Sequence, residues 1–308
     1  MRRWAGLWVC VLAACSAKNS PGTGNIAGSA ASVVADPAVL VVAAADAAHA
    51  KPLLHQQQQL ITVITADWQS TAATLQLWQR DAAGHWQADG EPWPGVIGKT
   101  GAAWGMGLHG NGVPVMPAGV GATGPEMERT SARSEPGPEM ERTSARSERG
   151  PLKAEGDQRS PAGAFELGGA FGYAEVEQAK LAYAAVGPTW RCVDDSASVH
   201  YNRVFDSKGI AVDWQSAEQM RRKDALYTLV IETKHNATAK AGAGSCIFLH
   251  VWRDAQSPTV GCTAMPQDRL RWLLGKIDPA QHPAFVLLPR SVYAELAHSW
   301  DLPPALLN

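Results

Sequence analysis

The stretch SCIFLHVWRDAQSPTVGCTAM, residues 245–265, begins as an apolar β-strand and carries two chemically reactive side chains. His250 ends the apolar run, and Cys262 follows twelve residues later, directly after Gly261. A cysteine attacks only as its thiolate, and an imidazole on an adjacent strand can serve as its base. The glycine allows a tight turn that aims backbone N–H groups at a developing oxyanion. The alternative is that Cys262 is a small buried hydrophobic residue and His250 a core histidine.

The first residues of the chain predict export. Arg2 and Arg3 precede a short apolar stretch, residues 4–14, which is too short to span a bilayer because a span takes roughly 20 apolar residues. The ending LAAC resembles a bacterial lipobox, so we expect a lipoprotein signal peptide over residues 1–14 and lipidation of Cys15. The alternative is an ordinary signal peptide with an incidental cysteine. Ser16 favours the outer over the inner membrane, so we expect a lipid-anchored periplasmic protein.

The cysteines then predict one disulfide. Of the five, Cys10 lies in the signal peptide and Cys15 is the lipidation site, which leaves Cys192, Cys246 and Cys262. An odd number in an oxidising compartment favours a Cys192–Cys246 disulfide and a free Cys262 thiol. Such a bond would stabilise the fold by roughly 2–4 kcal/mol. The alternatives are three free thiols or a transient Cys246–Cys262 pair. No spacing is typical of a zinc site, so we expect no structural metal.

Composition and length set the broad class. The chain has 308 residues and a formal net charge of −2. This length suffices for one large domain with a sizeable core, which we expect to be monomeric. The slightly acidic balance, without a basic stripe that interleaves aromatic residues, argues against a nucleic-acid partner.

Two regions follow the signal peptide, and a repeat interrupts the second. Residues 15–51 are rich in small residues and suit a flexible tether, and residues 52–308 form the expected catalytic domain. That domain is interrupted by a tandem duplication, GPEMERTSARSEP (residues 124–136) followed by GPEMERTSARSER (residues 137–149). Two polar copies cannot bury a core, so we expect a disordered, low-complexity insertion over residues 110–150.

The catalytic domain reads as mostly β. Apolar or alternating runs rich in β-branched residues predict strands at residues 60–65, 74–79, 226–231, 246–250 and 284–289. Residues 269–274 predict a short helix after the cysteine. Asp89 and Gly90 predict a turn.

The motifs together resemble one enzyme family. GDQRSPAG at residues 156–163, SCIFLH at 245–250, PTVGCTAM at 258–265 and FVLLP at 285–289 resemble the L,D-transpeptidase (YkuD-type) catalytic domain of bacterial cell-wall enzymes. The resemblance covers roughly residues 60–289. It implies a β-sandwich with a few short helices and peptidoglycan stem peptides as substrates. It also implies that Cys262 is the nucleophile and His250 the base, with backbone N–H groups at Gly261 and Cys262 as oxyanion donors.

The motif around the cysteine departs from the family pattern. Val260 stands where the family usually has a second histidine, and no arginine or asparagine follows closely. The chain therefore looks like a divergent branch. Arg253 is a candidate replacement for the missing charge near a substrate carboxylate, or an ordinary solvated arginine. His235 and Asn236 precede the histidine strand and are candidates for the substrate cleft, or for a surface loop.

The resemblance implies a two-step acyl transfer that needs no metal or organic cofactor. A Cys262 thioester forms as D-alanine leaves a tetrapeptide stem, and an amine from a second stem resolves the thioester to a crosslink. Resolution by water would make the protein an L,D-carboxypeptidase, and another cell-wall cysteine amidase would use the same residues. The non-enzyme alternative is a wall-binding lipoprotein with a degenerate site.

Overall fold

The computed structural model describes residues 51–116, 149–176 and 179–305. The predicted signal peptide, Cys15, nearly all of the tether and nearly all of the tandem repeat lie outside these residues. Lys51–Asn308 forms one compact unit. No helix of the described residues is long and apolar enough to cross a membrane.

The described chain is mostly strand. Its first half contains β1 (Gln59–Thr65), β2 (Ala72–Arg80), β3 (Trp86–Val96), β4 (Ala102–Trp104), β5 (Met106–Gly107), β6 (Gly110–Asn111) and β7 (Ser160–Gly172). Its second half contains β8 (Tyr183–Ala185), β9 (Trp190–Val193), β10 (Val204–Asp206), β11 (Ala217–Gln219), β12 (Leu229–Thr233), β13 (Phe248–Val251), β14 (Thr263–Met265) and β15 (Ala284–Pro289). The helices are α3 (Gln267–Lys276), a 3₁₀ turn (Pro279–Gln281) and α4 (Arg290–Trp300).

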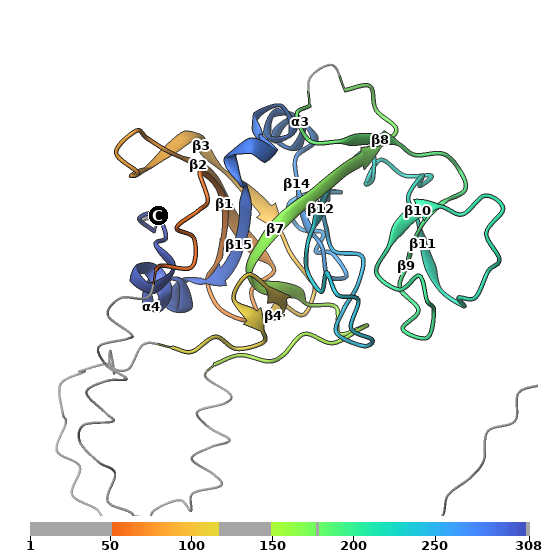
Figure 1. Cartoon of the computed structure of the whole chain (residues 1–308), viewed down its shortest axis with the longest axis horizontal. Helices are drawn as coiled ribbons and strands as arrows, with labels where there is room; N and C mark the ends of the chain where they lie inside the picture. The colour runs from red at the N-terminus through yellow and green to blue at the C-terminus, as the bar shows by residue number, and fades with distance from the viewer. Residues whose placement is uncertain (1–50, 117–148, 177–178, 306–308) are drawn as a thin grey trace, which may run out of the picture. The chain divides into compact units, whose positions relative to one another are not determined.

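Eight of these strands close on themselves. The order β12-β13-β14-β3-β2-β1-β15-β7 returns to its start because β7 also pairs with β12, so the sheet resembles a barrel. The long strand β7 makes this closure: its residues 163–166 pair with β15 and its residues 167–172 with β12. Figure 1 shows β7 crossing the centre of the molecule. The mostly β fold is confirmed, whereas the pairing does not confirm two separate layers.

The centre of this sheet was the easiest part to predict. β1 (QLITVIT) is buried along its whole length, between β2 on one side and β15 on the other. A strand covered on both faces reads as a continuous apolar and β-branched run rather than an alternating one. α4 covers this region with four buried side chains at helical spacing, Val292, Tyr293, Leu296 and Trp300.

The expected turn at Asp89 and Gly90 is wrong, because both residues lie inside β3. The register of β2 and β3 shifts between Leu75 and Leu77, opposite this point. Gly90 has φ +76°, and the buried Gln76 amide donates to the carbonyls of Asp89 (3.3 Å) and Gly90 (3.0 Å). The turn-forming residues therefore make an irregularity within the strand rather than its end.

The expected insertion over residues 110–150 is too wide at both ends. Gly110–Asn111 forms β6, which pairs with β5. At the other end, the Trp104 indole donates to the Arg149 carbonyl at 2.5 Å. Both ends thus belong to the packed domain, and residues 117–148 lie outside the part that the structure describes.

A second, small sheet lies beside the closed one (Figure 1) and has the order β10-β9-β11. A disulfide between Cys192 of β9 and Cys246, just before β13, ties it to the closed sheet. This is the pair that the cysteine count favoured. Cys192 is also the register partner of Glu218 in β11. Glu218 is therefore held near β13 in two steps: β11 pairs with β9, and the disulfide joins Cys192 of β9 to Cys246.

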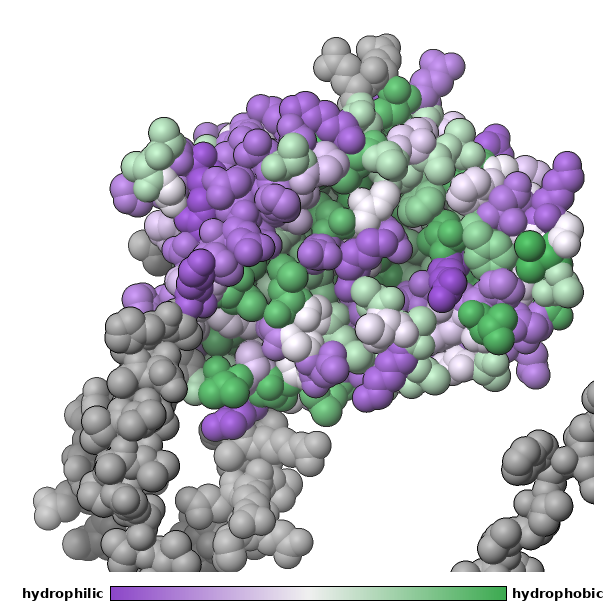
Figure 2. Space-filling view, viewed as in Figure 1, coloured by the Kyte–Doolittle hydropathy of each residue, from purple (hydrophilic) through white to green (hydrophobic). Residues whose placement is uncertain are grey.

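The loops of the small sheet expose apolar side chains. Val199, Ile210 and Val212 are all exposed. Figure 2 shows apolar residues among polar ones on this side of the molecule. Scattered exposed apolar residues are normal for a soluble surface and define no site by themselves.

Candidate active site

Cys262 and His250 are brought to the same side of two neighbouring strands. β13 and β14 are parallel, and His250 pairs in register with Ala264. Because side chains alternate along a strand, Cys262, two residues before Ala264, faces the same side as His250. Both residues line one cavity of about 270 Å³. The two residues that the sequence pairs through their spacing, the preceding glycine and the expected compartment therefore line one cavity.

Two hydroxyl groups hold the backbone at the cysteine. The Cys262 carbonyl accepts hydrogen bonds from Ser160 Oγ (2.8 Å) and Thr259 Oγ1 (2.6 Å). Ser160 Oγ in turn accepts from the Gly98 N–H at 2.9 Å. The loop that carries the thiol is thereby fixed to the start of β7 and to the end of β3.

Gly261 has a conformational role that the structure makes plain. Its φ of +150° lies in a region that side chains disfavour. Its N–H donates to Thr259 Oγ1 at 3.1 Å. The oxyanion donor expected at Gly261 is therefore engaged within the loop in this conformation.

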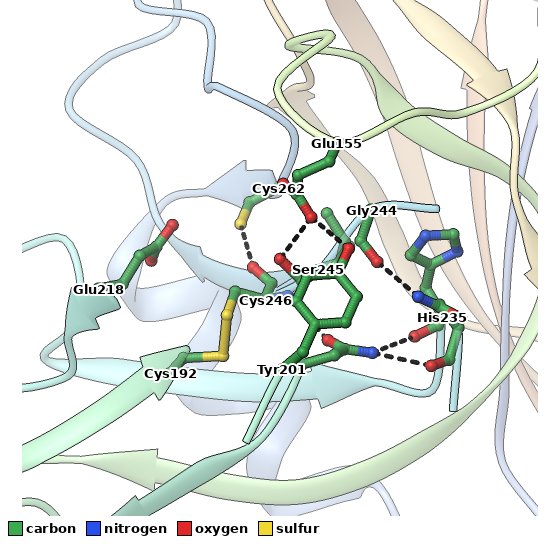
Figure 3. The surroundings of a disulfide bond; sticks show 12 residues. Glu155, Cys192, Tyr201, Glu218, His235, Gly244, Ser245, Cys246 and Cys262 are labelled. Carbon is green, nitrogen blue, oxygen red and sulfur yellow. Dashed lines mark hydrogen bonds between the residues drawn. A yellow bond between two sulfur atoms is a disulfide. The ribbon is translucent and has the colours of Figure 1, made fainter. Parts of the chain in front are cut away.

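The Cys262 thiol is buried, with 4% of the residue exposed, and is the free cysteine. Its sulfur donates to the Cys246 carbonyl at 3.5 Å (Figure 3). Burial raises the pKa of the thiol to about 12, and the nearby Glu218 charge adds to this effect. Hydrogen bonds from the Phe248 backbone and the Tyr227 side chain act in the opposite direction. At neutral pH the resting cysteine is therefore a thiol.

His250 is buried and oriented by a backbone carbonyl. Its Nδ1 lies 2.8 Å from the Val251 oxygen, and since a carbonyl only accepts, we assign the proton to Nδ1 and the lone pair to Nε2. Burial lowers the pKa of His250 to about 4. The imidazole is therefore neutral near pH 7 and can accept a proton. Resting Cys262 and His250 form a neutral pair, so proton transfer must accompany attack on a substrate.

Two arginines border the same cavity. Arg253, predicted as a substrate-carboxylate partner, is exposed and lines it. Arg222 also lines it and was not predicted. Its Nε and Nη2 each donate to one Asp224 oxygen at 2.8 Å, and its guanidinium lies 5.1 Å from the Tyr227 ring centre. The cavity thus offers positive charge beside the nucleophile.

A second cavity of about 240 Å³ also reaches Cys262 and has a different charge. Its lining includes the carboxylates Glu155, Asp194 and Glu218, together with Lys153. Glu155 accepts from Ser245 Oγ at 2.7 Å and from the Tyr201 hydroxyl (Figure 3). Glu218 and Cys262 border both cavities.

His235 and Asn236 do not line either cavity at Cys262, so their predicted role at the substrate is wrong for this site. His235 is buried: its Nδ1 accepts from the Met106 N–H at 3.2 Å, and its Nε2 lies 3.0 Å from the Ala243 carbonyl. The Asn236 amide donates to the carbonyls of Lys240 (2.9 Å) and Gly244 (3.0 Å). Both side chains fold the loop between β12 and β13.

The donor set does not suit a metal ion. Within the described residues, no group of three or more histidine, cysteine, aspartate or glutamate side chains could hold one. The chain was also compared with protein-family models, curated proteins and solved structures, and none of the three comparisons gives a match.

Proposed function

We propose that the protein is a cysteine acyltransferase of the L,D-transpeptidase type that acts on peptidoglycan stem peptides. The observation that carries this proposal is the Cys262–His250 pair. His250 of β13 and Cys262, directly before β14, line one cavity, and His250 Nδ1 is held by the Val251 carbonyl. A core cysteine and a core histidine would need neither a shared cavity nor a fixed tautomer.

The reaction starts from the neutral pair. His250 Nε2 takes the Cys262 proton as the sulfur attacks the carbonyl of the L,D bond that follows diaminopimelate in a tetrapeptide stem. The imidazolium then gives its proton to the departing amine of D-alanine, which leaves a thioester on Cys262. The amine of a second stem, deprotonated by His250, attacks the thioester and forms a 3–3 crosslink. Attack by water gives a tripeptide instead.

The charged and apolar residues around Cys262 match the carboxylate of a stem peptide and the chain next to it. Arg253 and Arg222 place positive charge in the cavity, where a stem-peptide carboxylate would bind. Val260, which replaces the histidine of the family pattern, is 66% exposed at the rim. It contributes apolar surface rather than charge to the cavity lining.

The remaining parts of the proposal come from the sequence. The LAAC motif supports a lipid anchor at Cys15 and a periplasmic location, at the outer rather than the inner membrane. The family resemblance supports a β-sandwich as the finer architecture of the mostly β domain. A monomer in contact with peptidoglycan and membrane, but not nucleic acid, fits the composition.

The test is mass spectrometry of muropeptides after incubation of the mature protein with a purified disaccharide tetrapeptide. We expect loss of D-alanine, which Cys262→Ala abolishes and His250→Ala slows by at least about 10²-fold, as for the loss of a general base. His55→Ala, which changes an exposed histidine far along the chain, is the matched control and should retain activity.

The products separate the alternatives. Dimers identify a transpeptidase, and tripeptide alone identifies an L,D-carboxypeptidase. Cleavage of a different bond by the same cysteine identifies another amidase. An unchanged tetrapeptide, from a folded protein with a reactive thiol, would refute the proposal and favour a wall-binding role.

A further inference from the structure

A tyrosine and a glutamate lie against the nucleophile, and the acyl-transfer scheme above uses neither. Tyr227 is 4% exposed, and its hydroxyl donates to Glu218 Oε2. Both residues line the cavity that holds Cys262 and His250. Tyr227 also acts on the Cys262 thiol, because its hydroxyl lowers the pKa of that thiol. The phenol therefore lies between a carboxyl group and the attacking sulfur.

The Tyr227 ring is held on several sides. It packs edge-on against Phe248 (centroids 5.8 Å apart, planes at 79°) and His250 (5.2 Å, 65°). The Arg222 guanidinium lies near the same ring. A phenylalanine would fill this apolar space equally well, so packing does not explain why a hydroxyl ends at the cavity.

Glu218 reaches the site from a different part of the chain. It lies in β11, in register with Cys192 of β9, and the disulfide to Cys246 fixes this sheet beside β13. Figure 3 shows the Glu218 side chain on the same side of the disulfide as the Cys262 sulfur. Glu218 also borders both cavities that reach the thiol.

We propose that Tyr227 is a further catalytic residue, whose hydroxyl stabilises the Cys262 thiolate, and that Glu218 is a positioning residue that controls this hydroxyl. The inference rests on the proposed function. A phenol has one proton and cannot donate it to the carboxylate and the sulfur at once. When Glu218 is ionised, it holds the Tyr227 proton. When Glu218 is protonated, it donates to the phenol oxygen, and Tyr227 donates to the sulfur.

The proton balance closes with groups already in the site. The Cys262 proton passes to His250 Nε2, and the hydrogen bond from Tyr227 then compensates the charge left on the sulfur. Tyr227 keeps its proton throughout, and Glu218 changes only its own protonation. Burial raises the pKa of Glu218, which favours its neutral form over the carboxylate.

The other charged groups near the thiol come from every neighbouring element. Arg222 and Asp224 precede β12, and Arg253 follows β13. Lys153 and Glu155 precede β7, and Asp194 follows β9. Arg222 is paired with Asp224, and Glu155 is engaged by Ser245 and Tyr201. Glu218 is the carboxyl group whose charge acts most strongly on Cys262.

The test is the pH dependence of Cys262 alkylation by iodoacetamide in the mature protein, followed by mass spectrometry. Tyr227→Phe removes the donor, and we expect it to slow alkylation at a given pH by at least about tenfold. Glu218→Gln removes the negative charge, and we expect the opposite shift, with faster alkylation at the same pH. Tyr183→Phe is the matched control, because the Tyr183 hydroxyl donates to the Ala174 carbonyl outside the site.

Opposite shifts for the two variants support the proposal, because a purely structural hydrogen bond would loosen the site in the same direction when either partner is changed. Shifts in the same direction, or profiles equal to the wild type, would overturn it. Alkylation needs no peptidoglycan, so this result is independent of whether stem peptides are the substrate. If the protein turns over the tetrapeptide but neither variant shifts the pH profile of Cys262 alkylation, this inference is refuted and the proposed function stands.

Discussion

The two hydroxyl groups on the Cys262 carbonyl give a prediction whose size follows from the structure. Ser160→Ala removes the bond to this carbonyl and also leaves the buried Gly98 N–H without its acceptor. Thr259→Val removes the second bond to the carbonyl and the acceptor of the Gly261 N–H. A buried donor that loses its partner costs roughly 1–3 kcal/mol. We expect each variant to lower the free energy of unfolding by about 2 kcal/mol.

The double variant is more informative than either single one. After one substitution the Cys262 carbonyl keeps one donor, but after both it is buried with none from these side chains. We therefore expect the double variant to lower the free energy of unfolding by about 1 kcal/mol more than the sum of the two single variants. The same loss should loosen the loop and change the alkylation rate of Cys262.

Urea unfolding, followed by tryptophan fluorescence, measures all three variants. Thr100→Val is the control, because its hydroxyl also donates to a carbonyl, that of Asp157 at 2.7 Å, but in an exposed turn. We expect the control to change stability by less than about 0.5 kcal/mol. If Ser160→Ala and Thr259→Val lower the free energy of unfolding as little as the control does, or if their effects simply add in the double variant, the two hydroxyls do not support the cysteine loop.

Three further outcomes are expected. Burial lowers the pKa of His235 and of His250 to about 4, below the usual 6.5, so the unfolded chain binds protons first on acidification. The contribution of each histidine to the free energy of unfolding should therefore be complete above pH 6.5 and fall by up to about 3 kcal/mol between pH 6.5 and 4. Urea unfolding across that range measures this change. A free energy of unfolding that stays constant from pH 7 to 4 would contradict it. Replacement of Cys192 and Cys246 by serine opens a loop that spans a sequence separation of 54 residues and should cost about 4 kcal/mol in the same experiment, whereas a change under 1 kcal/mol would show that the bond contributes little. Gly163→Ala should lower the melting temperature and cost at least about 2 kcal/mol, because φ is +133° and a Cβ would approach the His109 ring within 2.0 Å; an unchanged melting temperature would contradict this packing.

The parts of the fold that the sequence predicted well are those with strong local signals. β1, β2 and β15 are continuous or alternating apolar runs, and α3 follows the cysteine as expected. β12 starts at Leu229, three residues later than predicted, because the apolar Leu226 and Tyr227 line the cavity instead of joining the ladder. α4 was missed although Val292 and Leu296 show its helical spacing, because the pattern follows directly after the strand that ends at Pro289.

The candidate site was predictable only where its residues are close in sequence. His250 and Cys262 lie in one motif, and their spacing suffices to place them on adjacent strands. Glu218 comes from a weakly patterned segment, and its position depends on strand register and a disulfide, which no local signal encodes. His235 and Asn236 show the reverse: polar residues near the motif in sequence serve the loop instead of the site.

The Cys192–Cys246 disulfide also affects when the site becomes complete after the chain is synthesised. Glu218 lies between Cys192 and Cys246 in sequence, inside the loop that their bond closes. In a reducing compartment, a newly made chain would carry its nucleophile directly before β14, while the segment with Glu218 lacked the disulfide. The charge pattern around the thiol would be fixed only after the chain had met an oxidant. If the chain is exported as we propose, its maturation is coupled to that step.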